Sequence, residues 1–163
     1  MRFTVRSRIM GIGDDSWIED EDGRHAFLVD GKALRVRRTF ELRSPDGEVL
    51  AVVRRRMLGI RDTMTVERGG RPAATVRKHL ISLPRDRFTV ELAEGGEWSV
   101  TGNVFRKEYT VAAEEGTVAV ISRKWVQVGL RDTYAVEVAE GADVPLALAV
   151  AIAVDTLSEG KGG

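Results

Sequence analysis

The sequence DVPLALAVAIAVDTLSEG, residues 143–160, predicts a helix that is apolar on every side. Asp143 is a candidate N-cap, and Pro145 suits the first helical turn. Residues 144–154 carry no charge, and a helix without a polar face is buried all round rather than packed on one side. We therefore expect a helix over 144–158 that the rest of the chain encloses.

A pattern that recurs about every 24 residues supplies the enclosing elements. Each unit has a basic residue, an apolar run with Gly or Pro, an acid, and a strand that ends in Ile-Glu or Val-Glu. The clear copies are RIMGIGDDSWIE at 8–19, RMLGIRDTMTVE at 56–67, KHLISLPRDRFTVE at 78–91 and KWVQVGLRDTYAVE at 124–137. Looser copies are RRTFELRS at 37–44 and RKEYTVAAE at 106–114. Such self-similarity marks a repeated supersecondary unit.

Each unit predicts a β-hairpin. Apolar and polar residues alternate in the first strands, and turn pairs such as Asp46-Gly47 and Gly69-Gly70 follow them. The alternation is less regular in the second strands, so we expect β-bulges there. These second strands are 24–30, 48–55, 71–78, 97–104 and 117–124.

With a strand at 3–8, the count reaches about 12 strands in meander order, and closure removes the exposed edges of so large a sheet. A 16-residue helix spans about 24 Å and an eight-residue strand about 26 Å, so the helix fits along the axis of such a barrel. The predicted fold class is mainly β: a closed antiparallel barrel of about 12 strands that encloses a C-terminal hydrophobic α-helix. We expect one domain over residues 1–159 and a flexible tail at 160–163.

Composition limits the function. The chain has 163 residues, no cysteine, and 25 basic and 25 acidic residues. It can form no disulfide and no thiolate metal site, which suits a reducing cytosol. A neutral total argues against a general nucleic-acid binder. Residues 144–154 are too few for a membrane span of about 20 residues, and the N-terminus lacks a signal-peptide core. We expect a cytoplasmic protein without a nucleic-acid partner.

Five segments together resemble a bacterial form of the LURP-one-related family. They are VDGKAL at 29–34, RRRMLGIRDTMTVE at 54–67, SRKW at 122–125, RDTYAVEV at 131–138 and VDTL at 154–157. The resemblance covers nearly the whole chain and implies the tubby-like fold, a 12-stranded barrel around a central hydrophobic helix. Related tubby-like domains bind phosphoinositide headgroups, and phospholipid scramblases have a similar fold. The cysteine-rich lipidation stretch of scramblases is absent, and no binding residue carries over from either group.

No residue pattern predicts an enzyme. The two histidines, His25 and His79, fall in different units, and no nucleophile motif or phosphate loop is present. The acids that recur at one position of the clear units are Asp14, Asp62, Asp86 and Asp132. Acids at strand starts more often cap turns or pair with arginine than act as general acids or bases. We therefore expect no enzyme, no cofactor and no metal site.

Basic clusters are the strongest functional signal. They are Arg54-Arg55-Arg56, Arg77-Lys78, Arg106-Lys107 and Arg123-Lys124. Most of them end the second strand of a unit, so a meander places them at one end of the barrel and the acidic hairpin turns at the other. Apolar loops at 57–60, 80–83 and 125–128 adjoin this basic rim, a combination that suits an anionic lipid surface.

Two functions stay open. In the first, the chain is a non-enzymatic binding module whose basic rim takes an anionic phospholipid or phosphoinositide headgroup, with peripheral contact to a membrane. The predicted site residues are Arg54, Arg56, Lys78, Arg123 and Lys124. In the second, the chain is a protein-interaction or scaffold domain that uses the barrel wall, with Trp17 or Trp98 in an exposed patch. The structural alternative for the rim is that the loops fold over the ends of the helix and the arginines pair with nearby acids. An enzyme would require a cleft that gathers His25 or His79 with two of the recurring acids.

Overall fold

A computed structural model of the chain describes residues 1–6, 15–31, 33–34, 37–58, 61–79, 85–103, 106, 108–123 and 133–159. The strands are β1 (Arg2–Arg6), β2 (Asp15–Glu19), β3 (His25–Asp30), β4 (Ala33–Leu34), β5 (Arg37–Arg43), β6 (Val49–Leu58), β7 (Arg61–Arg68), β8 (Arg71–Lys78), β9 (Arg85–Leu92), β10 (Glu97–Asn103), β11 (Glu108–Ala113), β12 (Gly116–Ser122) and β13 (Thr133–Val138). The helix is α1 (Val144–Glu159).

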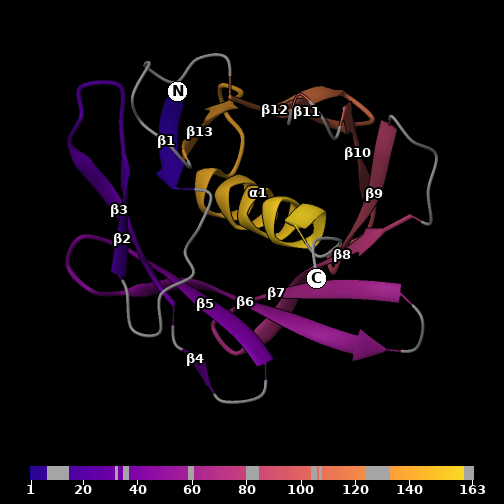
Figure 1. Ribbon diagram of the computed structural model, residues 1–163, viewed down its shortest axis with the longest axis horizontal. Helices are drawn as coiled ribbons and strands as arrows, with labels where there is room; N and C mark the ends of the chain where they lie inside the picture. The colour runs from indigo at the N-terminus through magenta and orange to yellow at the C-terminus, as the bar shows by residue number, and fades with distance from the viewer. Residues whose placement is uncertain are drawn as a thin grey trace.

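The strands close into a ring. Apart from β3 and β4, successive strands pair antiparallel. β1 also pairs with β13 and β3 with β5, so that 12 of the 13 strands form the barrel. The two-residue β4 lies outside the ring and pairs only with the start of β5. Figure 1 shows the ring with α1 inside it. The predicted fold class, a closed antiparallel barrel of about 12 strands around a C-terminal helix, is confirmed.

The expected β-bulges lie in the second strands of the hairpins. In four hairpins the register shifts by one residue, and the residue left unpaired belongs to the later strand each time. These residues are Ala26 in β3, Leu50 in β6, Ala73 in β8 and Val118 in β12. The pairing of β9 with β10 has no such shift. Bulges increase local twist and bend the strand, which helps a sheet curve into a barrel.

Helix α1 is buried along almost its whole length. Every residue from Ala147 to Val154 is at most 2% exposed. Asp143 is the N-cap, because its side chain accepts a hydrogen bond from the backbone N–H of Leu146 at 3.2 Å. Arg68 of β7 pairs with the same carboxylate and ties the start of the helix to the barrel. Among the described residues, no helix is both long and apolar enough to cross a membrane.

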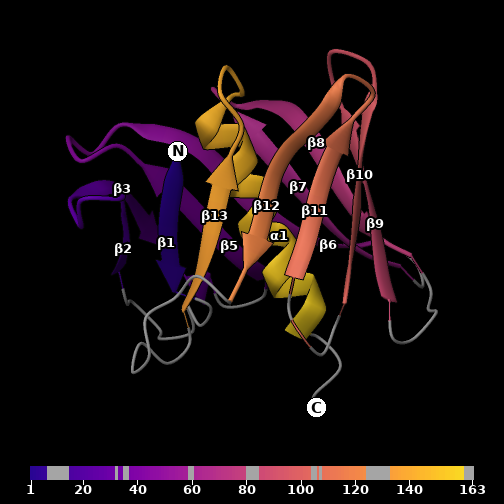
Figure 2. The ribbon, with the colours of Figure 1, turned by 90° about the horizontal axis from the view of Figure 1, so that it is seen from above.

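The two ends of the barrel differ. Figure 2 shows α1 running along the barrel, from the end that holds the short hairpin turns to the opposite end. The C-terminal end of α1 therefore lies at the end where β6, β8, β10 and β12 finish. Residues 160–163, expected to be a flexible tail, lie outside the described residues.

Candidate functional site

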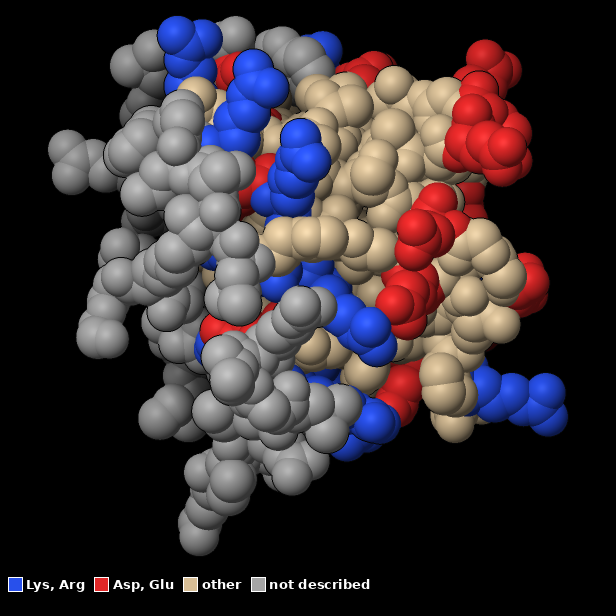
Figure 3. All heavy atoms as spheres, turned by 90° about the vertical axis from the view of Figure 1, so that its right-hand side faces the viewer, with Lys and Arg blue, Asp and Glu red and all other residues tan. Residues whose placement is uncertain are grey.

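Charge is separated along the barrel axis, as the sequence predicts. The exposed acids of the hairpin turns gather near the N-terminal end of α1; they are Glu21, Asp22, Asp46, Glu94, Glu97, Glu114 and Glu115. Basic side chains gather toward the other end. Figure 3 shows this on the face that includes β9, with most acidic side chains on the right and most basic ones beside the grey end on the left.

Two predicted site residues, Arg54 and Arg56, lie on the outer face of β6. They alternate with the fully buried Val53, so their side chains point away from the core. Both lie near Glu67 of β7: Arg54 Nε is 3.4 Å and an Arg56 terminal nitrogen is 3.9 Å from its carboxylate. One carboxylate thus lies beside two arginines, so the three side chains together carry a net positive charge.

Lys78, a third predicted site residue, faces the inside of the barrel. Its Nζ lies 3.5 Å from Asp86 and donates a hydrogen bond of 3.3 Å to the carbonyl oxygen of Leu157 near the end of α1. The same ammonium lies 5.8 Å from the centre of the Phe88 ring. The Lys78 and Asp86 side chains are only 12% and 6% exposed. A lysine at this position neutralises a buried acid and stabilises the negative end of the helix dipole.

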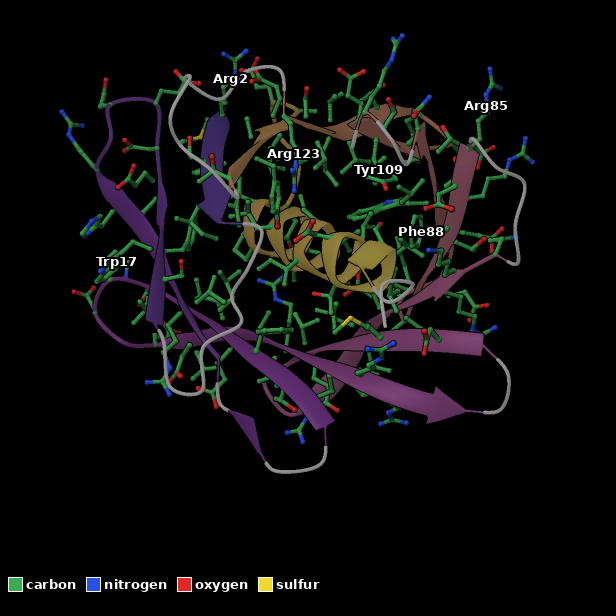
Figure 4. The ribbon with its side chains drawn as sticks, in the orientation of Figure 1. Arg2, Trp17, Arg85, Phe88, Tyr109 and Arg123 are labelled. Atoms are coloured by element: carbon green, nitrogen blue, oxygen red, sulfur yellow. The ribbon has the colours of Figure 1, made fainter. Side chains whose placement is uncertain are left out.

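Arg123 also lies on the inner side of the barrel. It follows β12 two residues after the buried Ile121, and Figure 4 shows it inside the ring of strands with Tyr109 and Phe88. The Tyr109 hydroxyl is hydrogen-bonded to Ser158 Oγ of α1 at 3.1 Å. Lys124, the fifth predicted residue, lies outside the described residues.

The pKa of the Tyr109 phenol depends on burial and on the charged groups around it. Burial raises the pKa of its phenol above the ordinary value, and the carboxylates of Asp86 and Asp155 raise it further. The hydrogen bond with Ser158 and the charge of Arg123 lower the pKa in part. We call the inner region at this end of the barrel the lumen mouth; it comprises Lys78, Asp86, Tyr109, Arg123, Asp155 and Ser158.

Two of the recurring acids, Asp62 and Asp86, pair with cations from the preceding strand. Asp62 accepts a hydrogen bond of 2.8 Å from Arg55 of β6, and Asp86 meets Lys78 of β8. The other two recurring acids, Asp14 and Asp132, lie outside the described residues. For Asp62 and Asp86 the expected structural role, pairing with nearby cations, agrees with the geometry.

A second group of cations lies on the outer face of β9 and beside it. Arg85 and Arg87 are exposed and alternate with Asp86 and Phe88, which face inward. Arg106, between β10 and β11, is also exposed. Within the described part of the chain, no carboxylate lies within 4.0 Å of the guanidinium groups of these three arginines. We call Arg85, Arg87 and Arg106 the arginine wall.

A pocket of about 380 Å³ adjoins the arginine wall. Its lining residues come from β10, β11, β12 and Arg106; they are Thr101, Gly102, Asn103, Arg106, Glu108, Tyr109, Thr110, Val120 and Ser122. Arg85 pairs across the sheet with Asn103, and Arg87 pairs with Thr101. Arg85 and Arg87 therefore lie on the strand next to the pocket-lining strand β10, on the same outer face of the sheet.

The other candidate residues, the two histidines and Trp98, lie apart from one another. His25 stacks on Trp17 with ring centroids 4.3 Å apart, and His79 is hydrogen-bonded to Thr89. Trp98 packs against the core. No described residues form a group of three or more histidines or acids able to hold a metal ion. Most of the apolar loops predicted beside the rim, at 57–60, 80–83 and 125–128, lie outside the described residues.

Comparison with known families decides the affiliation. A family model described as LURP-one-related matches residues 1–155. The chain belongs to the LURP-one-related family. It is also similar to the uncharacterized protein YxjI of Bacillus subtilis (strain 168), with 22% identity over 151 residues, which cover 93% of this chain and 90% of that protein. No solved structure matches. The resemblance seen in five sequence segments is thereby confirmed.

In this LURP-one-related chain, the structure divides the predicted site residues between two faces. Arg54 and Arg56 are outside, whereas Lys78 and Arg123 are inside. Arg85 and Arg87 are candidates that clustering of basic residues at strand ends does not single out, because each stands alone between non-basic neighbours. A signal was present: in RDRFTVEL, residues 85–92, strict alternation places both arginines opposite the inward Phe88 and Val90.

Proposed function

We propose that this LURP-one-related chain is a non-enzymatic binding module for the headgroups of anionic phospholipids. The contact surface is the outer face at the end of the barrel where α1 finishes. The arginine wall forms its centre, and Arg54 and Arg56 flank it. Lys78 is assigned to the fold rather than to the ligand, because its ammonium already has an acid and a carbonyl as partners.

The observation that carries this proposal is that Arg85, Arg87 and Arg106 are exposed on one face with no ion-pair partner among the described residues. A cation that already holds an acid must give up that partner to bind a ligand, whereas these three need not. Each arginine near an anionic membrane contributes about 1 kcal/mol, so the three together favour binding by roughly 100-fold.

Co-sedimentation with vesicles tests the proposal. The chain should bind phosphatidylcholine vesicles that contain phosphatidylglycerol roughly 100-fold more tightly than vesicles of phosphatidylcholine alone, and the preference should shrink as salt rises. Arg85→Gln/Arg87→Gln should lose about tenfold or more of that preference. The matched control, Arg24→Gln/Arg71→Gln, removes the same charge near the acidic turns and should retain it. Equal binding to both vesicles at low salt would refute the proposal.

The alternative function is a protein-interaction or scaffold domain. The stack of Trp17 on His25 favours it, because Trp17 alternates with the buried Ile18 and so lies on the outer wall of β2. Tryptophan is enriched at the centres of protein interfaces. In that case Trp17→Ala should release a partner that co-purifies with the chain while vesicle binding stays unchanged. A chain that co-purifies with no partner would count against this alternative.

A further inference from the structure

The pocket beside the arginine wall is lined by two chemically different kinds of residue. Thr101 and Thr110, which are both exposed, supply hydroxyl groups. The exposed Arg106 supplies a guanidinium group, and we call this part of the lining the arginine edge. Arg85 and Arg87 extend this edge, since they pair with the lining residues Asn103 and Thr101.

These two kinds of residue call for a ligand with two kinds of group. The arginine edge suits a phosphate, which accepts several charge-assisted hydrogen bonds from guanidinium groups. The threonine hydroxyls can donate hydrogen bonds to the hydroxyl groups of a ligand and accept hydrogen bonds from them. A phosphate ester that bears neighbouring hydroxyls satisfies both kinds of residue, whereas inorganic phosphate satisfies only one.

The lining of the pocket is held in place from inside the barrel. Tyr109 is one of the lining residues, and its hydroxyl is hydrogen-bonded to Ser158 of α1. The ring of Tyr109 lies against Gly102, where a Cβ atom would collide with it. The ring also packs edge-on against Phe88, with centroids 5.9 Å apart. A preformed lining lowers the ordering cost of binding.

We propose that this pocket binds a polyol phosphate, a phosphate ester with neighbouring hydroxyl groups, either free or as the glycerol phosphate headgroup of a lipid. The lipid form rests on the proposed function, because it requires the arginine wall to meet a membrane. The free form does not depend on it. The pocket would then select among anionic headgroups that the wall alone attracts equally.

Calorimetric titration of the whole chain with sn-glycerol 3-phosphate and with inorganic phosphate tests the pocket directly. Glycerol phosphate should bind at least fivefold more tightly than inorganic phosphate. Thr110→Val keeps the shape and strand propensity of the side chain but removes the hydroxyl, and it should abolish that difference. The matched control is Thr75→Val, an outward residue of β8 away from the pocket, which should keep it. Equal affinity for the two anions would overturn the proposal.

A second arm separates this inference from the proposed function. Vesicles with phosphatidylglycerol should bind more tightly than vesicles with an equal charge of phosphatidylserine. If both anionic vesicles bind equally and glycerol phosphate binds no better than inorganic phosphate, the pocket proposal fails while the proposed function stands. If glycerol phosphate binds but neither anionic vesicle does, the proposed function fails while the pocket proposal stands in its free form.

Discussion

Strand β9 carries charges on both of its faces, and the two faces differ in how those charges are satisfied. On the inner face Asp86 is 6% exposed and meets Lys78 at 3.5 Å. On the outer face Arg85 and Arg87 are exposed and have no ion-pair partner in the described residues. Figure 4 shows Arg85 directed away from the barrel and Phe88 directed into it.

The role of a cation here therefore depends on its partners and not on its position in a basic cluster. Inside the barrel a cation compensates a buried acid and the C-terminal end of α1, so its loss affects folding. On the outer face, a cation without a partner contributes little to the stability of the fold, and its charge is available to a ligand.

The largest effect should come from a charge inside the helix. Ala151 is fully buried, so Ala151→Asp places an unpaired carboxylate in the core and should destabilise the domain by more than about 4 kcal/mol, enough to unfold it. Circular dichroism during urea titration measures this. Ser99→Asp, on the exposed outer face of β10, is the control and should change stability by less than about 0.5 kcal/mol. A folded Ala151→Asp variant with an unchanged melting temperature would refute the buried helix.

Removal of the inner cation should have the next largest effect. Lys78→Met leaves Asp86 buried without its cation, and the Oδ2 atom of Asp86 has no hydrogen bond among the described residues. The expected loss is about 3 kcal/mol of unfolding free energy in urea. Lys78→Met/Asp86→Leu should recover most of this loss, since it removes the uncompensated charge. A double variant as unstable as the single one would contradict the role of the pair.

A smaller effect should follow from Gly102→Ala. The added Cβ would meet the ring of Tyr109 and the backbone oxygen of Glu108, so the strands or the ring must shift. Overpacking of this kind costs about 1–3 kcal/mol, measurable by thermal unfolding. Ser99→Ala on the same strand serves as the control and should be nearly neutral. An unchanged melting temperature for Gly102→Ala would show that the ring moves freely.

Tyr109→Phe should have a modest effect with a distinct pH dependence. Loss of the hydrogen bond with Ser158 should cost about 1 kcal/mol. Burial raises the pKa of the Tyr109 phenol, so the folded chain holds this proton more tightly than the unfolded chain, in which it titrates near 10.0. This contribution to stability is present below pH 10.0 and lost as pH rises through the folded pKa.

Urea unfolding below and above pH ~10 measures this contribution. Tyr109→Phe should lose less stability than the unchanged chain over this rise in pH, because it lacks the phenol. The same alkaline loss in both proteins would mean that other groups cause it.

Most of the fold could be predicted from the sequence because its determinants are local and periodic. Alternation with period two predicts the strands, turn pairs predict the hairpins, and the uncharged run 144–154 predicts the helix. The weaker alternation predicted bulges in five second strands, and four of them are bulged. The expectation for 97–104 is wrong, because β10 pairs with β9 without a register shift. The two-residue β4 could not be predicted, because it carries too few residues for a period.

The site was less predictable because it depends on which face each residue takes at a strand end. The residues of the basic clusters lie toward one end of the barrel, but the clusters mix the inward Lys78 with the outward Arg56. Bulges shift the alternation, so the face of a residue beyond a bulge cannot be counted from the turn. The pocket depends on the register of β10 with β9 and β11, a long-range property that one sequence does not contain.

The contrast between the two faces is tested most directly by one paired measurement on Arg87→Gln and Lys78→Met. For each variant, the unfolding free energy and the affinity for phosphatidylglycerol vesicles are measured under conditions where both are folded. Arg87→Gln should lose about fivefold in vesicle affinity and less than about 0.5 kcal/mol in stability. Lys78→Met should lose stability and keep its vesicle affinity. An Arg87→Gln variant that binds like the unchanged chain, beside a Lys78→Met variant that loses binding, would contradict the account.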